Sequence, residues 1–545
     1  MQSTVLSLSL DPSIAYDDAL LREYLTKNTL SKEKRTFSFR RIKESIDGRK
    51  GKVVIHLDVE IFFTDTPPPL FSSVRAYPSV AHAPQALVIG AGPAGLFAAL
   101  RLIELGIKPI VLERGKDVRA RRRDLAALNK KHVVNPESNY CFGEGGAGTY
   151  SDGKLYTRSK KRGDIRRILE IFVQHGATER ILVDTHPHIG TNKLPMVVQA
   201  LREQILAAGG EVHFDRKVVD FLLENQEIKG VKTEDNQIFL GIGVILATGH
   251  SARDIFHLLH QKQILIEPKP FAMGVRIEHP QSFVDTCQYH RPERGLLPPA
   301  AYSLVTQTKY KGVQRGVFSF CMCPGGFIVP AATAPGELVV NGMSPSRRDS
   351  YFANSGVVVA IHPQDWEPYL PEHGPLAALA LQEEVERKLW EKTQAQVVAK
   401  QEDTEEGSRA QIAPAQRIPD FLARRKSKSL LPTSYQPGLL SCEMDDVLPA
   451  FIAEPLREAL PQFNRKMKGY ASAQGQLIGL ESRTSSPVRI PREKETLEHP
   501  QIKRFFPCGE GAGYAGGIVS AAMDGERCAE NLAKLYHAVS PPDSE

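Results

Sequence analysis

The sequence has few cysteines, only two tryptophans and no long apolar run. Its seven cysteines are scattered over 545 residues and odd in number, which is typical of reduced thiols and argues against a disulfide framework. No stretch of about 18 apolar residues occurs, so we expect no membrane span. Residues 1–11 have neither a basic start nor a long apolar core, so the pattern of a signal peptide is missing. We therefore expect a cytoplasmic protein.

Excess charge of either sign is also missing. Lysine and arginine number 69 against 63 aspartate and glutamate, a net charge of +6 that does not favour a nucleic acid or a membrane as partner. Basic residues do cluster within 116–131 and 158–167. Such clusters can steer an anionic substrate, a reduced nicotinamide cofactor or RNA, but a solvated face is the more ordinary explanation.

What the chain does have, in residues 86–114, is the order strand, glycine turn, helix, strand. The first strand ends in Gly-x-Gly-x-x-Gly, whose glycines are Gly90, Gly92 and Gly95. The first permits a tight turn, the second lets a dinucleotide pyrophosphate approach the backbone, and the third lets the helix pack on the strand. The phosphates then lie at the helix N-terminus, where free N–H groups point outward. Glu113 ends the second strand, where it can accept a hydrogen bond from the adenosine ribose.

A second glycine-rich segment covers residues 141–155. Its five glycines indicate backbone conformations or close approaches that side chains would block. Glycine-rich backbone with free N–H groups suits a phosphate or a flat ring system. Lys154, near the end of the segment, can place a positive charge close to a flavin.

The C-terminal region returns to the same theme. Short strands within 211–239 are predicted to form a meander, which leads into an apolar strand that ends in Ala247-Thr248-Gly249. A strand at 505–508 then precedes Glu510 and another helix. Glu510 can bind ribityl hydroxyls and the amides of Gly517–Ile518 a ring carbonyl. A cofactor that needs this distant second site is FAD, whereas a nicotinamide dinucleotide does not.

Two further regions flank these motifs. Residues 5–63 read as a strand, a helix (15–28) and two strands, followed by a proline-rich linker. From about 265 to 500, frequent prolines and short apolar runs indicate a second domain inserted in the first. Its predicted helices are 376–392, 450–460 and 463–468, and its predicted strands are 271–278, 302–308, 316–322, 326–330 and 337–341.

The inserted region contains two candidate substrate contacts. Cys321 and Cys323 would share one face of a strand, which suits redox chemistry or a core. Cys-x-Cys alone does not complete a four-ligand zinc site, and no histidine pair stands nearby, so we predict no metal site. Arg483, within a hydroxyl-rich run, suits an anion or a carbonyl as well as a plain turn. We take Lys154, Arg483 and Cys323 as candidate catalytic or substrate-binding residues.

Together these motifs resemble the two-dinucleotide-binding-domain flavoproteins. More narrowly, segments 141–155, 320–326, 481–488 and 507–525 resemble the uncharacterised FAD-dependent dehydrogenase family of bacteria and plastids. The resemblance implies bound FAD and supplies no substrate. It places FAD at Gly90, Gly92, Gly95, Glu113, Gly146, Val218, Thr248, Gly509, Glu510 and Ile518. Neighbours in the same motifs complete the expected site, namely Pro93, Ala94, Arg114, Gly145, Ala147, Ala247, Gly249, Gly516 and Gly517. Glu510 stands where related flavoproteins usually have aspartate.

The expected fold is α/β, with a Rossmann-like FAD-binding domain, an inserted α+β substrate domain and a small N-terminal βαββ unit. The expected order is a βαββ domain (1–64), a linker (65–84), the first part of the FAD-binding domain (85–262), the inserted domain (263–500), the last part of the FAD-binding domain (501–536) and a tail (537–545).

The expected function is an FAD-dependent oxidoreductase, a dehydrogenase or reductase that acts on a small molecule. A second Gly-x-Gly-x-x-Gly after a strand is missing, so NAD(P)H would bind only transiently. Two alternatives stay open: a flavin-dependent RNA-modifying enzyme that uses the basic clusters, and a non-catalytic FAD-binding redox sensor.

Overall fold

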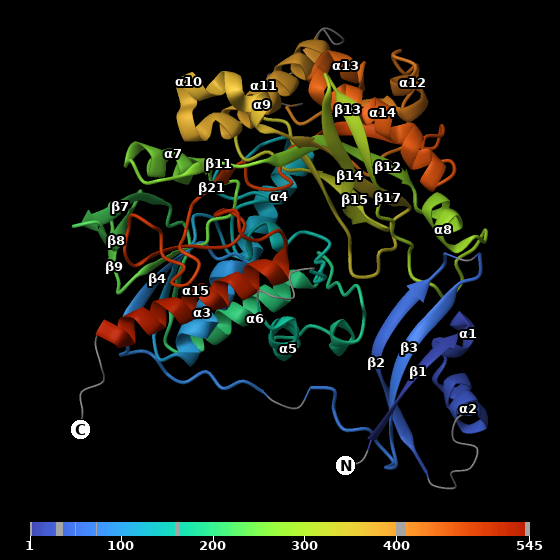
Figure 1. Ribbon diagram of the computed structural model, residues 1–545, viewed down its shortest axis with the longest axis horizontal. Coiled ribbons are helices and arrows are strands. Elements are labelled where there is room, and N and C mark those ends of the chain that lie inside the picture. The colour runs from blue at the N-terminus through green and yellow to red at the C-terminus, as the bar shows by residue number, and fades with distance from the viewer. Residues whose placement is uncertain are drawn as a thin grey trace.

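Three regions make up the molecule (Figure 1). The computed structural model describes residues 3–28, 36–49, 51–71, 74–157, 163–398 and 410–539. The basic stretch 158–162 and most of the predicted tail lie outside these residues. Within the described ranges, no helix is both long and apolar enough to cross a membrane.

The N-terminal unit is the predicted βαββ arrangement, drawn in blue in Figure 1. It consists of β1 (Ser3–Leu10), α1 (Pro12–Ala15), α2 (Asp18–Asn28), β2 (Ser38–Asp47) and β3 (Val54–Phe62). The strands pair antiparallel in the order β1-β3-β2. The predicted helix 15–28 starts later, at Asp18, because Asp11 caps a separate short turn. The apolar core of the unit is continuous with that of the inserted domain.

A five-stranded parallel sheet forms the centre of the second region, with the order β22-β10-β4-β5-β6. Its strands are β4 (Gln85–Ile89), β5 (Lys108–Leu112), β6 (Glu211–His213), β10 (Val244–Leu246) and β22 (Phe505–Pro507). Strand β22 therefore returns to this sheet after an insertion of more than two hundred residues. The prediction that 211–214 belongs to the meander is wrong, since β6 joins the main sheet. The meander is a separate sheet of β7 (Val218–Glu224), β8 (Glu227–Thr233) and β9 (Ile238–Leu240).

Two helices lie side by side on this sheet (Figure 1). They are α3 (Pro93–Glu104), which follows the first glycine turn, and α15 (Ile518–Val539), which follows the last. They approach closely at Gly525, where a Cβ would stand 2.0 Å from the Ala94 carbonyl oxygen. The remaining helical elements of the region are α4 (Val118–Lys131), η1 (Gly146–Gly148), α5 (Ile165–Gln174), η2 (Glu179–Leu182), α6 (Leu194–Ala207) and α7 (Arg253–Gln261).

The inserted region is built on a seven-stranded sheet, β13-β14-β17-β12-β20-β18-β19. Its strands are β12 (Phe271–Pro280), β13 (Val305–Tyr310), β14 (Val313–Cys323), β17 (Phe352–Ile361), β18 (Ala413–Arg417), β19 (Leu439–Ser441) and β20 (Gln476–Glu481). Two small pairs accompany it, β11 (Glu267–Pro268) with β21 (Val488–Arg489), and β15 (Phe327–Pro330) with β16 (Val340–Met343). The central strand β17, which pairs along its whole length with β12, was not predicted.

The helices of the inserted region lie around its sheet, most of them at the top of Figure 1 and the first of them at the right. They are α8 (Gln281–Tyr289), α9 (Pro363–Trp366), η3 (Glu367–Tyr369), α10 (Leu370–His373), η4 (Gly374–Leu376), α11 (Ala377–Val398), α12 (Ile418–Leu422), α13 (Met444–Val447) and α14 (Ala450–Lys466). The predicted helices 450–460 and 463–468 are one helix, α14, which continues through Pro455 and Pro461. Its buried face holds it together where proline would otherwise end it. The sheet memberships fit the predicted division of the chain, and the exact domain boundaries stay predictions.

Candidate functional site

A cavity of about 380 Å³ opens at the carboxyl ends of the parallel strands. Gly90 follows β4, Glu113 follows β5, Ala247 follows β10 and Gly509 lies just beyond β22, and all four line it. Ligands of open α/β sheets bind outside this edge of the sheet. The cavity therefore lies where the sequence motifs place a dinucleotide.

Nearly all predicted cofactor residues line this one cavity. They are Gly90, Gly92, Pro93, Ala94, Glu113, Arg114, Gly146, Ala147, Val218, Ala247, Thr248, Gly249, Gly509, Glu510, Gly516, Gly517 and Ile518. Gly95 and Gly145 do not, because both face inward. A Cβ on Gly95 would stand 1.9 Å from the Gly90 carbonyl oxygen, and one on Gly145 would stand 1.7 Å from Thr149 Oγ1. These two glycines shape the turns, and the contacts of the other residues with FAD stay predictions.

The lining fits a flat cofactor with phosphates because much of it is bare backbone. A Cβ on Gly249 or Gly516 would meet no atom within 4 Å, so it would project into open space. Helix α3 begins at Pro93, and Gly92 before it offers no side-chain cap, which leaves the first N–H groups of the helix for a ligand. A pyrophosphate suits this helix end, as the sequence predicted.

Glu113 has an additional structural role. Its buried carboxylate accepts hydrogen bonds from the backbone N–H groups of Ala91 (2.9 Å), Gly115 (2.9 Å) and Gly143 (3.0 Å). A carboxylate has about four acceptor positions, so one is left for the predicted ribose hydroxyl. Glu113 thus joins the first glycine turn, the end of β5 and the second glycine segment.

Arg121 holds the backbone of the second glycine segment through hydrogen bonds from its side chain. The prediction of a solvated face holds for its neighbours Arg119, Arg122 and Arg123, which are exposed, but it is wrong for Arg121. The fully buried guanidinium donates to the carbonyl oxygens of Asn139 (2.8 Å), Glu144 (2.8 Å) and Gly146 (2.9 Å). The sequence alone does not show which arginine of this basic run is buried, because that depends on the tertiary contacts of α4.

Two predicted arginines line the cavity with their charges already paired. Arg114 contacts Glu137 (2.6 Å) and Asp254 (2.9 Å), and its guanidinium lies 4.3 Å from the centre of the Phe142 ring. Arg483 also lines the cavity with its charge paired, and its role toward a substrate stays a prediction. Its guanidinium donates to Thr333 Oγ1 (2.6 Å) and pairs with Glu337 (2.7 Å) and Glu386 (3.0 Å).

Arg483 therefore belongs to a buried charge cluster instead of a free anion site. Arg253 joins the cluster, because it contacts Glu337 (2.9 Å) and Glu386 (2.7 Å) from α7. Burial opposes the charge on Glu386, but Arg253 and Arg483 together lower its pKa to about 2. The cluster joins the FAD-binding and inserted regions at the edge of the cavity.

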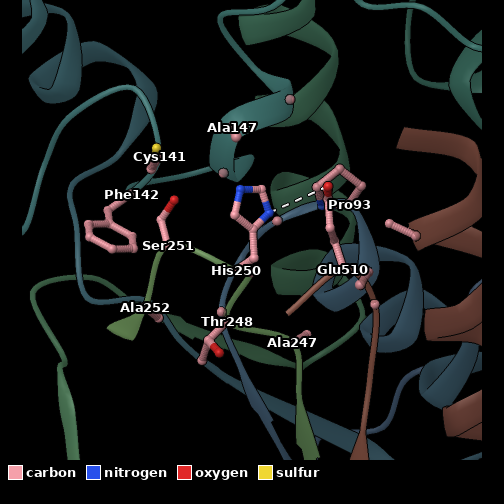
Figure 2. A pocket seen from close by; sticks show the side chains of 18 of the residues that line it. Pro93, Cys141, Phe142, Ala147, Ala247, Thr248, His250, Ser251, Ala252 and Glu510 are labelled. Carbon is pink, nitrogen blue, oxygen red and sulfur yellow. Dashed lines mark ion pairs between the residues drawn. The ribbon is translucent and has the colours of Figure 1, made fainter. Parts of the chain in front are cut away.

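The sequence missed several residues that line the cavity. Among them are His250, Ser251, Phe320, Asn341 and Thr484. His250 faces Glu510 across the cavity, with Nδ1 3.4 Å from the carboxylate (Figure 2). Its position directly after Ala247-Thr248-Gly249 was the available signal, since the residue after such a strand end enters the same loop.

Cys321 and Cys323 were predicted to share one face of a regular strand, and the structure contradicts this prediction. A β-bulge shifts the register between Phe320 and Cys323, and Cys321 adopts a positive φ of 46°. Such a conformation costs a non-glycine residue about 1–3 kcal/mol and often occurs at functional sites. As a result Cys321 lines the cavity, whereas Cys323 is fully buried and does not.

Lys154, like Arg483, is a predicted candidate that lines the cavity. Its amino group donates to the Met322 carbonyl oxygen and lies 3.9 Å from Asp152. Burial opposes its charge, but Cys321, Cys323 and Asp152 raise the pKa of Lys154 above its usual value. Asp152 also pairs with Arg348 at 2.5 Å. Arg348 lines a second cavity of about 1620 Å³, toward the N-terminal unit, so this ion pair separates the two.

A buried cluster that the sequence did not predict supports the last glycine turn. Cys508, Asp524 and Cys528 bring ligand-type atoms within 4.8 Å of one another. The Asp524 carboxylate accepts from the Gly509 N–H (2.8 Å) and pairs with Arg492 (2.6 Å). Arg492 thus neutralises the only carboxylate of the cluster, and Asp524 anchors the turn.

Comparison with known proteins decides the family. Residues 270–484 match the family described as "FAD-dependent protein, C-terminal domain-like", residues 84–236 match the "FAD binding domain" family, and residues 1–62 match a domain of unknown function. An uncharacterized protein of Clostridium beijerinckii (strain ATCC 51743 / NCIMB 8052) is 37% identical over 513 residues, which cover 91% of this chain and 92% of the relative. The chain belongs to this family of FAD-dependent proteins. FAD is its cofactor, and the glycine-lined cavity fits that group.

Solved flavoprotein structures resemble the chain only distantly. Glycine oxidase from Bacillus cereus ATCC 14579 is 12% identical, with 85% of this chain and 100% of that chain covered and a TM-score of 0.31. A geranylgeranyl bacteriochlorophyll reductase-like protein from Thermoplasma acidophilum is also 12% identical, with 84% and 79% covered and a TM-score of 0.32. At these values neither structure indicates the reaction of this chain.

Proposed function

We propose that the protein is an FAD-dependent oxidoreductase, a dehydrogenase or reductase that acts on a small molecule. Bound FAD supplies two-electron chemistry, and the protein orients the substrate and tunes the flavin ring. The glycine turns and Glu113 account for the pyrophosphate and the ribose. The rest of the cavity lining is not explained by the cofactor motifs, and a substrate would bind beside it.

The observation that carries this proposal is the contribution of the inserted region to the same cavity. Phe320, Cys321 and Asn341 come from β14 and β16 and line the cavity together with Lys154. Asn341 is held by Arg276, whose guanidinium donates to its side-chain oxygen at 2.8 Å. An apolar ring with a few fixed polar groups is the usual composition of a small-molecule site.

A screen of electron donors tests the proposal. Purified protein should be yellow, and at least one donor, NADH and NADPH included, should bleach the flavin absorption under anaerobic conditions. NAD(P)H would bind transiently, since the sequence has no second dinucleotide motif. FAD that stays oxidised with every donor would favour the redox-sensor alternative, and protein that takes up no FAD would refute the proposal.

Lys154 gives the proposal a second test. Its positive charge should stabilise reduced, anionic FAD, so Lys154→Gln should lower the flavin midpoint potential by about 30 mV, a tenfold change in the two-electron equilibrium. Lys217→Gln is the matched control. Lys217 also lines the cavity but pairs with Glu137 (2.9 Å) beside the adenosine-binding motif. Equal midpoint potentials in both variants would show that Lys154 does not lie close to the flavin ring.

A further inference from the structure

Two cysteine thiols and one lysine meet where β14 reaches the cavity. Cys321 lines the cavity, and Cys323 lies behind it, fully buried. Cys323 Sγ lies 3.2 Å from the Cys321 carbonyl oxygen, and the two side chains are close enough to shift each other's pKa. The two side chains are therefore neighbours, and Cys321 is the one that lines the cofactor cavity.

The β-bulge is what brings the two sulfurs together. Alternate residues of a regular strand stand roughly 6–7 Å apart along the strand, near the upper limit of about 6.8 Å for the Cα separation in a disulfide. The left-handed conformation of Cys321 and the register shift up to Cys323 interrupt that regular spacing. This interruption allows the two cysteines to come close enough for a disulfide, which a regular strand would barely permit.

The charges around the pair distinguish the two thiols. Lys154 and Arg276 face Cys321, and Asp152 and Glu481 oppose them. The hydrogen bond from Cys323, followed by the two cations, lowers the pKa of Cys321 despite its burial. The same hydrogen bond and burial raise the pKa of Cys323. Cys321 is thus the more easily deprotonated of the two thiols, and the thiolate is the reactive form of cysteine.

We propose that Cys321 and Cys323 form a redox-active dithiol that exchanges two electrons with bound FAD. In the forward direction the S–S bond forms and the S–H bond of Cys323 breaks. The electron pair and that proton pass to oxidised FAD, which becomes the reduced anion FADH⁻, so one negative charge stands on each side of the equation. In the reverse direction reduced FAD reopens the disulfide. This chemistry rests on the proposed function, because FAD is the oxidant.

The chain provides its own controls. Cys141 also lines the cavity, but it comes from the second glycine segment and is not part of the pair on β14. Cys508 and Cys528 form another thiol pair, but both are fully buried and neither lines the cavity. A reaction confined to Cys321 and Cys323 therefore needs both features, a neighbouring thiol and the cofactor cavity.

Anaerobic titration of the air-oxidised holoenzyme with dithionite counts the electrons. Wild type and Cys141→Ser should take up four electrons per FAD, and Cys321→Ser and Cys323→Ser only two. Peptide mapping of wild type alone, after acid quench and alkylation, gives a readout that needs no variant. In the oxidised enzyme the peptide with both cysteines should be two hydrogens lighter and unalkylated, and in the reduced enzyme it should be alkylated twice.

The outcomes of these experiments distinguish failure of the dithiol proposal from failure of the proposed function. Wild type that binds FAD, takes up two electrons and is alkylated at both cysteines in the oxidised state would overturn the dithiol and leave the oxidoreductase standing. A disulfide between Cys508 and Cys528 instead would also overturn it. Protein that takes up no FAD would overturn the proposed function, and with it the dithiol, which would have lost its oxidant.

Discussion

The two walls of the cavity are built by different means. The wall from the FAD-binding region is largely bare backbone, as at Gly249 and Gly516, where even a methyl group would point into open space. The wall from the inserted region consists of side chains, and a charge cluster of Arg483, Glu337 and Glu386 supports it. Backbone that receives a fixed cofactor follows local sequence motifs, whereas a side-chain wall depends on partners far apart in the chain. The following variants test this contrast.

The largest effect is expected in the charge cluster. Glu386→Gln leaves Arg253 and Arg483 buried beside a neutral partner, and removing one member of a buried pair costs about 3–5 kcal/mol of unfolding free energy. Glu391→Gln is the control on the same helix, α11, because its pair with Arg387 is about half exposed and should contribute at most about 0.5 kcal/mol. Chemical denaturation measures both. Equal losses would mean that the cluster does not support the wall.

The same cluster predicts a dependence on acid pH. The pKa of Glu386 is lowered to about 2, so its contribution is complete above the ordinary value of 4.5 and is lost as the pH falls toward 2. The loss amounts to about 3 kcal/mol. The difference in unfolding free energy between wild type and Glu386→Gln should therefore shrink between about pH 4.5 and about pH 2. A constant difference over this range would contradict the assigned ion pairs.

This contrast also explains how much the sequence could predict. The order of β4, α3 and β5, the acid at Glu113 and the return of the chain at Gly509 are local patterns, and the structure brings them together as expected. The β-bulge at Cys321 and the partners of Arg483 depend on residues that are distant in sequence. Arg121 shows the limit within one helix, since nothing in the basic run distinguishes it from Arg122.

An intermediate effect is expected at Arg121. Arg121→Met leaves three backbone carbonyl oxygens of the second glycine segment without their donor, and hydrogen bonds to a charged group contribute about 1.5–3 kcal/mol each. Removal of Arg121 also relieves the desolvation cost of a fully buried cation, which offsets much of this sum. The net loss of stability should be about 2 kcal/mol, with FAD affinity about tenfold weaker. Arg122→Met, on the exposed face of α4, should change neither quantity. Calorimetry of FAD binding, together with thermal unfolding, distinguishes the two variants.

The smallest effect on stability is expected at Gly516. A Cβ there meets no atom within 4 Å, and the backbone does not require glycine, so Gly516→Ala should change unfolding free energy by less than about 0.5 kcal/mol. The added methyl group projects into the cavity and should still weaken FAD binding by about tenfold. Unchanged FAD affinity, measured by flavin fluorescence, would show that the cofactor does not approach this turn.

The carboxylate of Glu113 has a consequence for cofactor uptake. It ties together three separate loops through the N–H groups of Ala91, Gly115 and Gly143, and these bonds form within the protein. The loops are therefore ordered when the chain folds, and not when the ligand arrives. Binding to such a preorganised receptor avoids the entropy cost of immobilising loops. Glu113 thus keeps the cofactor site in shape before FAD binds, in addition to its predicted contact with the ribose.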